Sequence, residues 1–477
     1  MSLTWLIPGV ADIQLPSEEN DFVLRTIESK FQVDLTLNIS TFDYVNKQNA
    51  MLAFSPPDMW YDKTSDGGQQ YARDGLLADM SPLINSDTMP NYLKYWVSND
   101  QLMAYGILEG KFVRAPIPYD RMSYRAYYIR RDWLNRLGLS IPDSYEEYLN
   151  VLRAFRNDDP DGNGKKDTYG FSLSAGGNSI GFDWPEYVKN GFPYGGHVGY
   201  GRWIESGLSL EMGHVIDDIR HVLNEDLIDP DWFLNRGTQH IEKAIQGKIG
   251  ILLQSSLEAV LDSNSNGLQQ RTRQLNPNAV WVPFTMFPGK PLRSEPSPGS
   301  PFLFAKTTAE QNPEKAKKSI QILDWLAGEE GFLLTHYGLE GTHYTRDGNQ
   351  IMLIRNSLND DDKLDFLRIW SFFTPNTPDL LGLTVVDPLE TDRDKEIKSI
   401  LRSLPLLPNI GTPLIAPPAF DLVDFRNRQQ QFLIKALLED KSSANWAQYL
   451  HDILYKYKGM ELNKTYEEQI RSAGMIK

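Results

Sequence analysis

The first 120 residues alternate between the apolar spacings of strands and of helices. Residues 4–10 form an apolar run that ends at Pro-Gly, as a buried strand does. Helical spacing follows over 21–31, and residues 33–40 then alternate apolar and polar, the pattern of a half-buried strand. Residues 109–120 predict another strand, whereas the double proline in 54–62 predicts a loop. Strand, helix and strand in this order predict an α/β domain.

Helical patterns continue along the rest of the chain. Residues 144–157 begin with Ser144, which can cap the helix, and Glu147 stands three residues later, as in a capping box. The remaining predictions are helices over 424–439 and 446–457, a polar loop over 263–278, and core positions on helix faces for Trp133, Trp325 and Trp446.

The stretch 158–170 reads DDPDGNGKKDTYG and has the pattern of a calcium loop. Oxygen side chains recur at every second position, and Gly164 takes the place where an EF-hand loop turns sharply. Gly170 stands where an EF-hand has its bidentate Glu, so a water, Thr168 or a distant carboxylate must complete the shell. The expected ligands of a structural Ca²⁺ are Asp159, Asp161, Asn163, Lys165 through its carbonyl, Asp167 and Thr168. A solvated turn is the alternative, because Asp, Asn and Gly favour turns without a metal.

Composition narrows the functional classes. A chain of 477 residues suggests two or three domains. The formal charge of −15 disfavours nucleic acids and anionic membranes as partners, since both require basic surfaces. There is no cysteine, which excludes disulfides, thiolate zinc sites and cysteine nucleophiles. No apolar run approaches the ~20 residues that span a bilayer.

Short motifs follow one another over most of the chain, and each is weak alone. They are Pro57-Asp58, Gly75 to Leu83, Gly110 to Pro116, Tyr128 to Pro142 with the calcium loop after it, Gly247 to Gly250, and Asn312 to Tyr344. Their order resembles the extracellular solute-binding proteins of ABC importers, family 1, the carbohydrate type, and above all the large lipoprotein-type members of Gram-positive bacteria. The calcium loop is similar to that of the alginate-binding receptors, although Thr168 stands where those often have Glu. Residues 113–115 also depart from the usual Tyr-Gly-Leu.

The resemblance implies a two-lobe, type II periplasmic-binding-protein-like α/β fold, with a ligand cleft between lobes joined by hinge segments. We expect lobe one to hold 1–116 with 285–345, and lobe two to hold 117–284 with 346–477. Such a receptor is not an enzyme: it captures an oligosaccharide by hinge closure and delivers it to the permease transmembrane subunits. A monomer is usual for the family.

The resemblance also predicts an extracellular lipoprotein. We see no signal peptide, and residues 1–3 look like a cloning scar, so we expect a leader with a lipidated cysteine upstream.

Aromatic side chains in loops are candidates for sugar contacts, because they offer flat apolar faces with polar rims. An arginine near the hinge could bind a uronate carboxylate through two hydrogen bonds. The expected ligand-binding residues are Asp58, Trp60, Arg114, Tyr119, Trp184, Trp203, Trp232, Trp281, Tyr344 and Trp370, with Arg121 and Tyr194 as further candidates. The alternatives are core packing for each aromatic, a turn-capping Asp58 and solvated arginines.

Two other functions stay open. A calcium-containing glycoside hydrolase or lyase needs only two carboxylates, and the chain has 63. An adhesion module would need only surface aromatics. Neither is marked by a motif, since the chain lacks paired metal-binding histidines, a nucleophile elbow, a phosphate-binding loop and a dinucleotide fingerprint.

Overall fold

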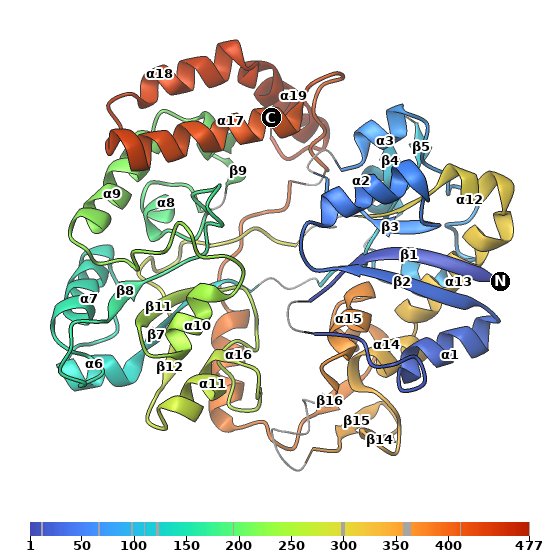
Figure 1. Ribbon diagram of the computed structural model, residues 1–477, viewed down its shortest axis with the longest axis horizontal. Helices are drawn as coiled ribbons and strands as arrows, with labels where there is room; N and C mark the ends of the chain where they lie inside the picture. Colours follow the sequence, from blue (N-terminus) through green and yellow to red (C-terminus); the bar gives the residue numbers. More distant parts are fainter. Residues whose placement is uncertain are drawn as a thin grey trace. The chain divides into compact units, whose positions relative to one another are not determined.

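The computed structural model describes residues 1–10, 13–64, 67–96, 99–108, 110–120, 124–193, 195–296, 301–355, 364–410 and 412–476. The chain divides into two compact α/β units, labelled by element in Figure 1. Unit 1 comprises 1–121, 296–389 and 411–415, and unit 2 comprises 122–295, 390–410 and 416–477. None of the helices in the described part of the chain is long and apolar enough to cross a membrane.

A five-stranded sheet in the order β2-β1-β3-β13-β6 forms the centre of unit 1. Strand β1 is parallel to β2 and β3, and β13 is antiparallel to both β3 and β6. Leu3, Trp5 and Ile7 of β1 join one hydrophobic cluster, and Leu6 joins another that includes Tyr44 of α2. Burial on both faces explains why the first strand reads as a continuous apolar run. The strands are β1 Ser2–Pro8, β2 Asp34–Ser40, β3 Met59–Tyr61, β13 Pro301–Phe304 and β6 Arg114–Pro116.

Helices and two small sheets complete unit 1. The helices are α1 Phe22–Phe31, α2 Tyr44–Phe54, α3 Gln69–Arg73, α4 Pro90–Leu93, α5 Asn99–Gly106, α12 Lys306–Gln311, α13 Pro313–Ala327, α14 Glu329–Tyr337 and α15 Leu367–Trp370. The small sheets are β4 Ile107–Leu108 with β5 Lys111–Phe112, and β14 Tyr344–Asp347 with β15 Gln350–Leu353 and β16 Thr384–Val386.

A four-stranded sheet in the order β12-β7-β11-β8 forms the centre of unit 2. Strands β8 and β11 are parallel, and β7 is antiparallel to both β11 and β12. The strands are β7 Ala126–Arg130, β8 Tyr169–Phe171, β11 Ile249–Gln254, β12 Trp281–Phe284, and the hairpin of β9 Gly196–Gly199 with β10 Arg202–Glu205. The helices are α6 Arg131–Leu137, α7 Tyr145–Asn157, α8 Pro185–Lys189, α9 Met212–Asn224, α10 Gln239–Ile245, α11 Leu268–Leu275, α16 Asp392–Arg402, α17 Leu422–Ile434, α18 Trp446–His451 and α19 Gly459–Ser472.

The unit boundaries differ from the predicted lobe boundaries in the C-terminal half. Residues 346–389 lie in unit 1 and not in unit 2, because β15 and β16 pack on α14 through a cluster that includes Phe332, Leu333 and Ile351. Residues 285–295 lie in unit 2. The chain returns to unit 2 at Glu390, just before α16.

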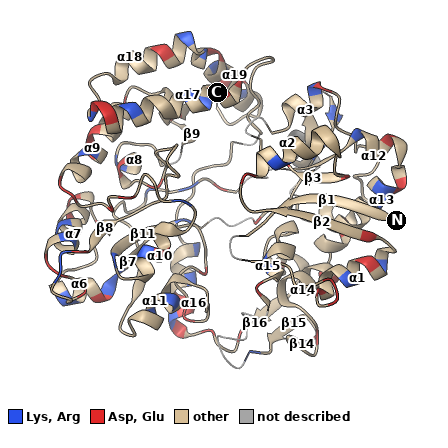
Figure 2. Ribbon diagram, in the orientation of Figure 1, with Lys and Arg blue, Asp and Glu red and all other residues tan. Residues whose placement is uncertain are grey.

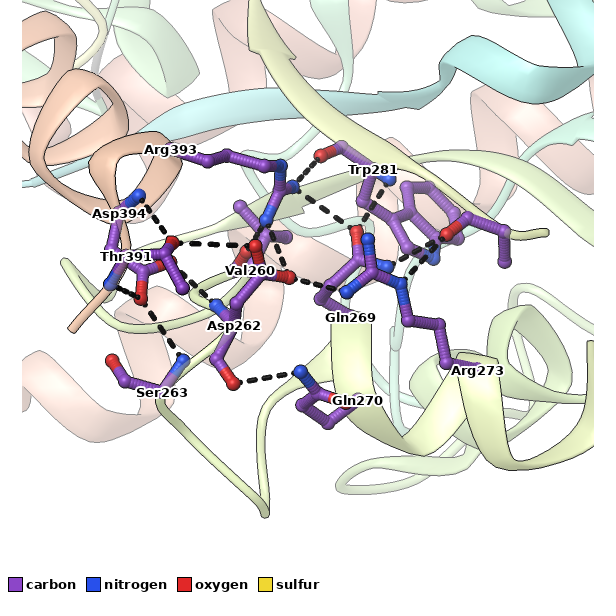
Figure 3. Close-up of polar contacts among 11 residues, drawn as sticks. Val260, Asp262, Ser263, Gln269, Gln270, Arg273, Trp281, Thr391, Arg393 and Asp394 are labelled. Carbon is purple, nitrogen blue, oxygen red and sulfur yellow. Dashed lines mark hydrogen bonds and ion pairs between the residues drawn. The ribbon is translucent and has the colours of Figure 1, made fainter. Parts of the chain in front are cut away.

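A polar network fixes α16 to the rest of unit 2 (Figure 3). The Asp394 carboxylate accepts hydrogen bonds from the backbone N–H groups of Asp262, at 2.6 Å, and Ser263, at 3.0 Å. Arg393 donates through Nη1 to the carbonyl of Val260 at 3.0 Å and lies 3.0 Å from Asp262 Oδ1. This network explains why residues 390–410 belong to unit 2, far from its other segments in sequence.

Several local predictions are confirmed, and others differ. Ser144 caps α7 by accepting from Glu147 N–H, but the Glu147 carboxylate accepts from Asp143 N–H instead of completing the capping box. The predicted loop over 54–62 contains β3, because the two prolines precede a short buried strand. The polar stretch 263–278 contains α11, which buries one narrow face. Trp133, Trp325 and Trp446 are buried on helices, as predicted. The predicted C-terminal helices run through π-helical segments at Lys435–Asp440 and Asp452–Lys456.

Candidate functional site

The carboxyl ends of the parallel strands define one edge of each central sheet. In open α/β sheets, ligands bind outside these ends. In unit 1 this edge is formed by the segments that come after β1, β2, β3 and β6, and in unit 2 by those after β8, β11 and β12. We therefore ask which of the predicted residues lie at these edges.

Asp58 and Trp60 are core residues of unit 1. Asp58 lies before β3, and its carboxylate accepts from Thr4 N–H at 2.9 Å and from the Thr308 hydroxyl at 2.9 Å. Lys315 forms an ion pair with it at 3.1 Å. Trp60 is fully buried and packs edge-to-face on Tyr71, with ring centroids 6.0 Å apart. These contacts hold both side chains in the core of unit 1, and their contact with a sugar stays a prediction.

Arg114 and Tyr119 lie on and just after β6. The Arg114 side chain is only 5% exposed, and Nη2 donates to the carbonyl of Ile107 at 3.3 Å. It is therefore engaged within unit 1 and is not the solvent-facing cation that a uronate would need. Tyr119 is half-buried, and its ring packs on Trp96 with centroids 5.7 Å apart. Tyr119 comes after the carboxyl end of β6, so it lies at the carboxyl edge of the sheet.

Tyr344 and Trp370 are packing residues of unit 1. Tyr344 begins β14 and is buried in the cluster of Phe332 and Ile351. Trp370 ends α15, is fully buried, and donates its indole N–H to Asp21 at 2.9 Å. The sequence around Trp370 indicates a loop, but helical structure places the ring inside.

Trp184 and Trp232 are brought together in unit 2. Their ring centroids lie 4.9 Å apart in an edge-to-face arrangement, and Trp184 also packs on Phe171 of β8. Trp184 is fully buried and donates its indole N–H to the Ile180 carbonyl at 3.0 Å. Trp232 is nearly buried, and its carbonyl accepts from Ala175 N–H at 3.2 Å. The two rings therefore pack beneath the segment that follows β8, at the carboxyl edge of the sheet.

An open depression of about 440 Å³ lies beside this segment. It includes Leu234, an exposed aliphatic side chain, and Asn235, whose carbonyl accepts from the Ser174 hydroxyl at 2.8 Å. Lys243 lies in its wall and pairs with Asp229 at 2.8 Å and with Asp231 at 2.9 Å. These pairs raise the pKa of Lys243 against the opposing effect of burial. Amides, carboxylates, the Lys243 ammonium and one apolar side chain therefore line this depression.

Trp203 and Trp281 complete the predicted aromatics. Trp203 lies on β10, largely buried, with its ring 6.4 Å from that of Tyr466. Trp281 begins β12, is fully buried, and donates its indole N–H to the Thr272 hydroxyl at 3.0 Å. Both make packing contacts within unit 2, and their contact with a sugar stays a prediction. Arg121 and Tyr194 lie outside the described residues.

Phe42 is an exposed aromatic residue that is not among the predicted ligand-binding residues. It comes shortly after β2 at the carboxyl edge of unit 1 and is 80% exposed. The sequence could have indicated its exposure. Phe42 stands in a Ser-Thr-Phe-Asp turn directly after an alternating strand, where a phenyl ring has no core to pack into.

The predicted calcium loop begins where α7 ends, and Gly164 turns the chain with φ +76°. Asn163 sits among the carboxylates: its side-chain amide donates to Asp161 Oδ2 at 2.8 Å and to Asp167 Oδ1 at 3.2 Å. The Asp159 carboxylate accepts from the N–H groups of Asn163 and Gly164, each at 3.0 Å. Among the described residues, no group of three or more His, Asp or Glu side chains is arranged as a metal site.

The electrostatics of the loop nevertheless fit a cation. Burial raises the pKa of Asp161, and the nearby carboxylates of Asp159 and Asp167 raise it further. Desolvation tends to raise the pKa of Asp159. The hydrogen bonds that its carboxylate accepts from backbone N–H groups have the larger effect, so the pKa is lowered. The side-chain NH₂ group of Asn163 lies between the carboxylates of Asp161 and Asp167. A half-turn of this amide about its last side-chain bond would place its oxygen between them instead.

Thr168 is placed differently from the prediction. Its hydroxyl is buried and donates to the carbonyl of Phe155, in the last turn of α7, at 2.7 Å. It therefore satisfies a free carbonyl at a helix end instead of offering an oxygen to the loop.

Charge on the surface of unit 2 is mixed. Figure 2 shows acidic and basic residues together along α17, which contains Asp424, Arg426 and Arg428.

Comparison with known proteins yields several sequence relatives. No known family profile matches the chain. The chain is 25% identical to lipoprotein LipO of Bacillus subtilis over 48% of its length and 46% of that protein. It is 24% identical to the polygalacturonan/rhamnogalacturonan-binding protein YtcQ of the same organism over 64% of each. It is 28% identical to the fructooligosaccharide ABC transporter substrate-binding protein FusA of Streptococcus pneumoniae, over 53% of its length and 49% of that protein. The matches thus span about half to two thirds of these relatives.

Solved structures cover nearly the whole chain. FusA of S. pneumoniae in complex with kestose superimposes with a TM-score of 0.73 at 16% identity, over 99% of each chain. The alginate-binding protein AlgQ2, in a structure without calcium ion, gives a TM-score of 0.75 at 15% identity, over 98% of each. At these identities the likeness establishes the fold. The chain therefore has the two-lobe fold of ABC-transporter substrate-binding proteins and sequence relatives among them, which confirms the resemblance drawn from its ordered motifs.

Proposed function

We propose that this chain is the extracellular substrate-binding receptor of an ABC importer that captures an oligosaccharide and delivers it to a membrane permease. The observation that carries the proposal is the extent of the structural likeness, since sugar-binding receptors match over 98–99% of the chain. A lipoprotein among the sequence relatives supports an anchor at the outer face of the membrane.

In this proposal, the carboxyl edges of both central sheets hold the candidate sugar-binding side chains. We propose that aromatic and polar side chains at these edges contact the sugar and that binding is accompanied by hinge closure, as the resemblance implies. Because the ligand then has a higher affinity for the closed form, it shifts the population toward that form. The permease would recognise closure. No step of covalent chemistry is required of any residue, and we propose no enzymatic activity.

A thermal-shift screen tests the proposal. Mono- and oligosaccharides, neutral and uronic, are added to the protein in calcium and in EDTA. A ligand that binds the folded state at 100 times its Kd stabilises it by about 2.7 kcal/mol, so a matching sugar class raises the Tm by several degrees. The absence of a shift with every sugar class would contradict the proposal, and peptides would then be the next ligands to test.

We further propose that the loop after α7 holds a structural Ca²⁺, with Asp159, Asp161, Asn163, Asp167 and the Lys165 carbonyl as its oxygen donors. The carboxylate cluster and the raised pKa of Asp161 support this assignment. A solved structure of FusA described as an EF-hand mutant shares the fold at a TM-score of 0.70, so a relative has such a loop. The ion would neutralise the clustered charge and fix the end of the helix.

Replacing Asp161 by Ala separates stability from sugar binding. In millimolar calcium the variant should unfold at lower temperature than the parent, with a loss of about 2–3 kcal/mol, because the metal no longer stabilises the folded state. In EDTA the variant should match or exceed the parent, since one repulsive carboxylate is gone. Sugar affinity should change less than threefold. Identical melting curves of variant and parent in both buffers would contradict the calcium assignment.

A further inference from the structure

The carboxyl edge of unit 1 presents a cation and an exposed aromatic ring. Lys63 comes shortly after β3, and Phe42 comes shortly after β2. Strand β1 pairs with both of these strands in parallel register, so the two residues leave the sheet at the same edge. The Lys63 side chain is exposed, and Phe42 is among the most exposed large apolar residues of the chain.

The Lys63 ammonium is held in place by Tyr44. Its Nζ lies 5.1 Å from the centroid of the Tyr44 ring, a cation–π distance. The Tyr44 hydroxyl donates to the carbonyls of Leu6, at 3.0 Å, and Tyr61, at 2.8 Å, which fixes the ring across the ends of β1 and β3. Burial lowers the pKa of Lys63 somewhat. The cation is therefore positioned before any ligand arrives, and little side-chain entropy remains to be lost.

The neighbouring carboxylate does not neutralise Lys63. Asp62 is fully buried, and its Oδ1 accepts from the Gln48 amide at 3.2 Å and from the Thr64 hydroxyl at 2.8 Å. In the described part of the chain, no carboxylate forms an ion pair with Lys63, and burial is the cause of its pKa shift. In a protein of charge −15, such a cation at a ligand-binding edge calls for an anionic partner.

We propose that Lys63 and Phe42 form a subsite for an acidic sugar, with the uronate carboxylate paired to the Lys63 ammonium and a CH face of the sugar ring on Phe42. This inference rests on the proposed receptor function and names its substrate class. A charge-assisted hydrogen bond to carboxylate is stronger than one to a sugar hydroxyl, so Lys63 selects uronates over neutral sugars. The ring of Phe42 contributes apolar contact to either class.

Isothermal titration with a matched pair of ligands tests the subsite. The acidic probe is a tetragalacturonate, and the neutral probe is its fully methyl-esterified form, which has the same rings without the charge. Lys63→Gln should weaken binding of the acid at least tenfold and of the ester less than twofold. Raising NaCl from 50 to 300 mM should weaken acid binding to the parent and leave the variant nearly unaffected. Phe42→Ala should weaken both probes.

Controls keep the outcomes distinct. Lys94→Gln, an exposed lysine of the same unit, should bind both probes as the parent does, and unchanged melting curves confirm that each variant is folded. Equal losses for both probes in Lys63→Gln, or no loss for either, would overturn the subsite. Binding of neutral fructo-oligosaccharides alone would also overturn it while leaving the receptor function intact. If no carbohydrate binds the parent, the receptor function fails first, and the subsite with it.

Discussion

Replacing Arg393 by Ala should lower the free energy of unfolding by about 3 kcal/mol, because this side chain joins several acceptors at the start of α16. The Arg393 guanidinium donates to Val260 O and to Gln269 Oε1, and it lies 3.0 Å from the Asp262 carboxylate. Its removal takes one donor from each of these acceptors in a largely buried site, although Gln269 Oε1 still accepts from Trp281 N–H at 2.8 Å. Asp262 still forms an ion pair with Arg273 at 2.6 Å. The expected loss of unfolding free energy is therefore smaller than the largest losses caused by breaking a buried ion pair.

The measurement is urea unfolding followed by tryptophan fluorescence, with Arg402→Ala as the control. Arg402 is an exposed residue at the end of the same helix, so its replacement should change stability by less than about 0.5 kcal/mol. Arg393→Lys should fall between the two, because it keeps the charge and loses the planar fork. If Arg393→Ala were as stable as Arg402→Ala, the network would not be what holds the C-terminal segment to unit 2.

The second large effect concerns pH and the buried carboxyl group of Glu186, in the first turn of α8. Its pKa is raised to about 7, chiefly by burial and to a smaller extent by Asp218, although the hydrogen bond from the Tyr145 hydroxyl at 2.7 Å and the charge of Lys189 oppose the shift. Oε2 of this carboxyl group is buried and has no partner among the described residues. The folded protein therefore retains a proton here at pH values where the unfolded chain has lost it.

The sign of the effect follows from linkage. The folded pKa lies above the unfolded value of about 4.5, so the contribution is fully present below pH 4.5 and is lost as pH rises through 7. At about 1.4 kcal/mol for each pKa unit, the parent loses about 2–4 kcal/mol across this window. Glu186→Gln, which cannot ionise, should match the parent near pH 4.5 and exceed its stability by that amount at pH 8.

Stability curves of the two proteins from pH 4 to 9 provide the measurement. Glu146→Gln, at an exposed position of α7, is the control and should follow the parent throughout. Curves of Glu186→Gln and parent that run parallel across the whole range would contradict a neutral buried carboxyl group at this site.

The periodic parts of the fold could be predicted from the sequence. Strand β1, helix α1 and strand β2 follow from apolar spacing, and α7 follows from spacing and its Ser144 cap. Strand β3 could not, because three residues are too few for a period and two prolines precede them. The placement of residues 346–389 depended on tertiary packing of β15 and β16 against α14, which no local pattern encodes.

The candidate site was harder to predict than the fold. Aromatic residues in Gly- and Pro-rich stretches, such as Trp184, Trp281 and Trp370, are core residues here, because each indole N–H finds a partner inside its own unit. Arg114 differs from its prediction for the same reason. Lys63 and Phe42 became candidates only when the parallel register placed them at one edge. Residue type alone does not separate core aromatics from binding aromatics.

The most direct test of the receptor function is to incubate the protein with a binding oligosaccharide at equal molar concentrations and then analyse both the complex and the recovered sugar. Native mass spectrometry gives the stoichiometry, and chromatography of the sugar after denaturation gives its chain length. We predict one oligosaccharide bound per chain and a sugar recovered unchanged after many hours. A shortened or unsaturated sugar would contradict the receptor account and would establish a hydrolase or a lyase, respectively, in its place.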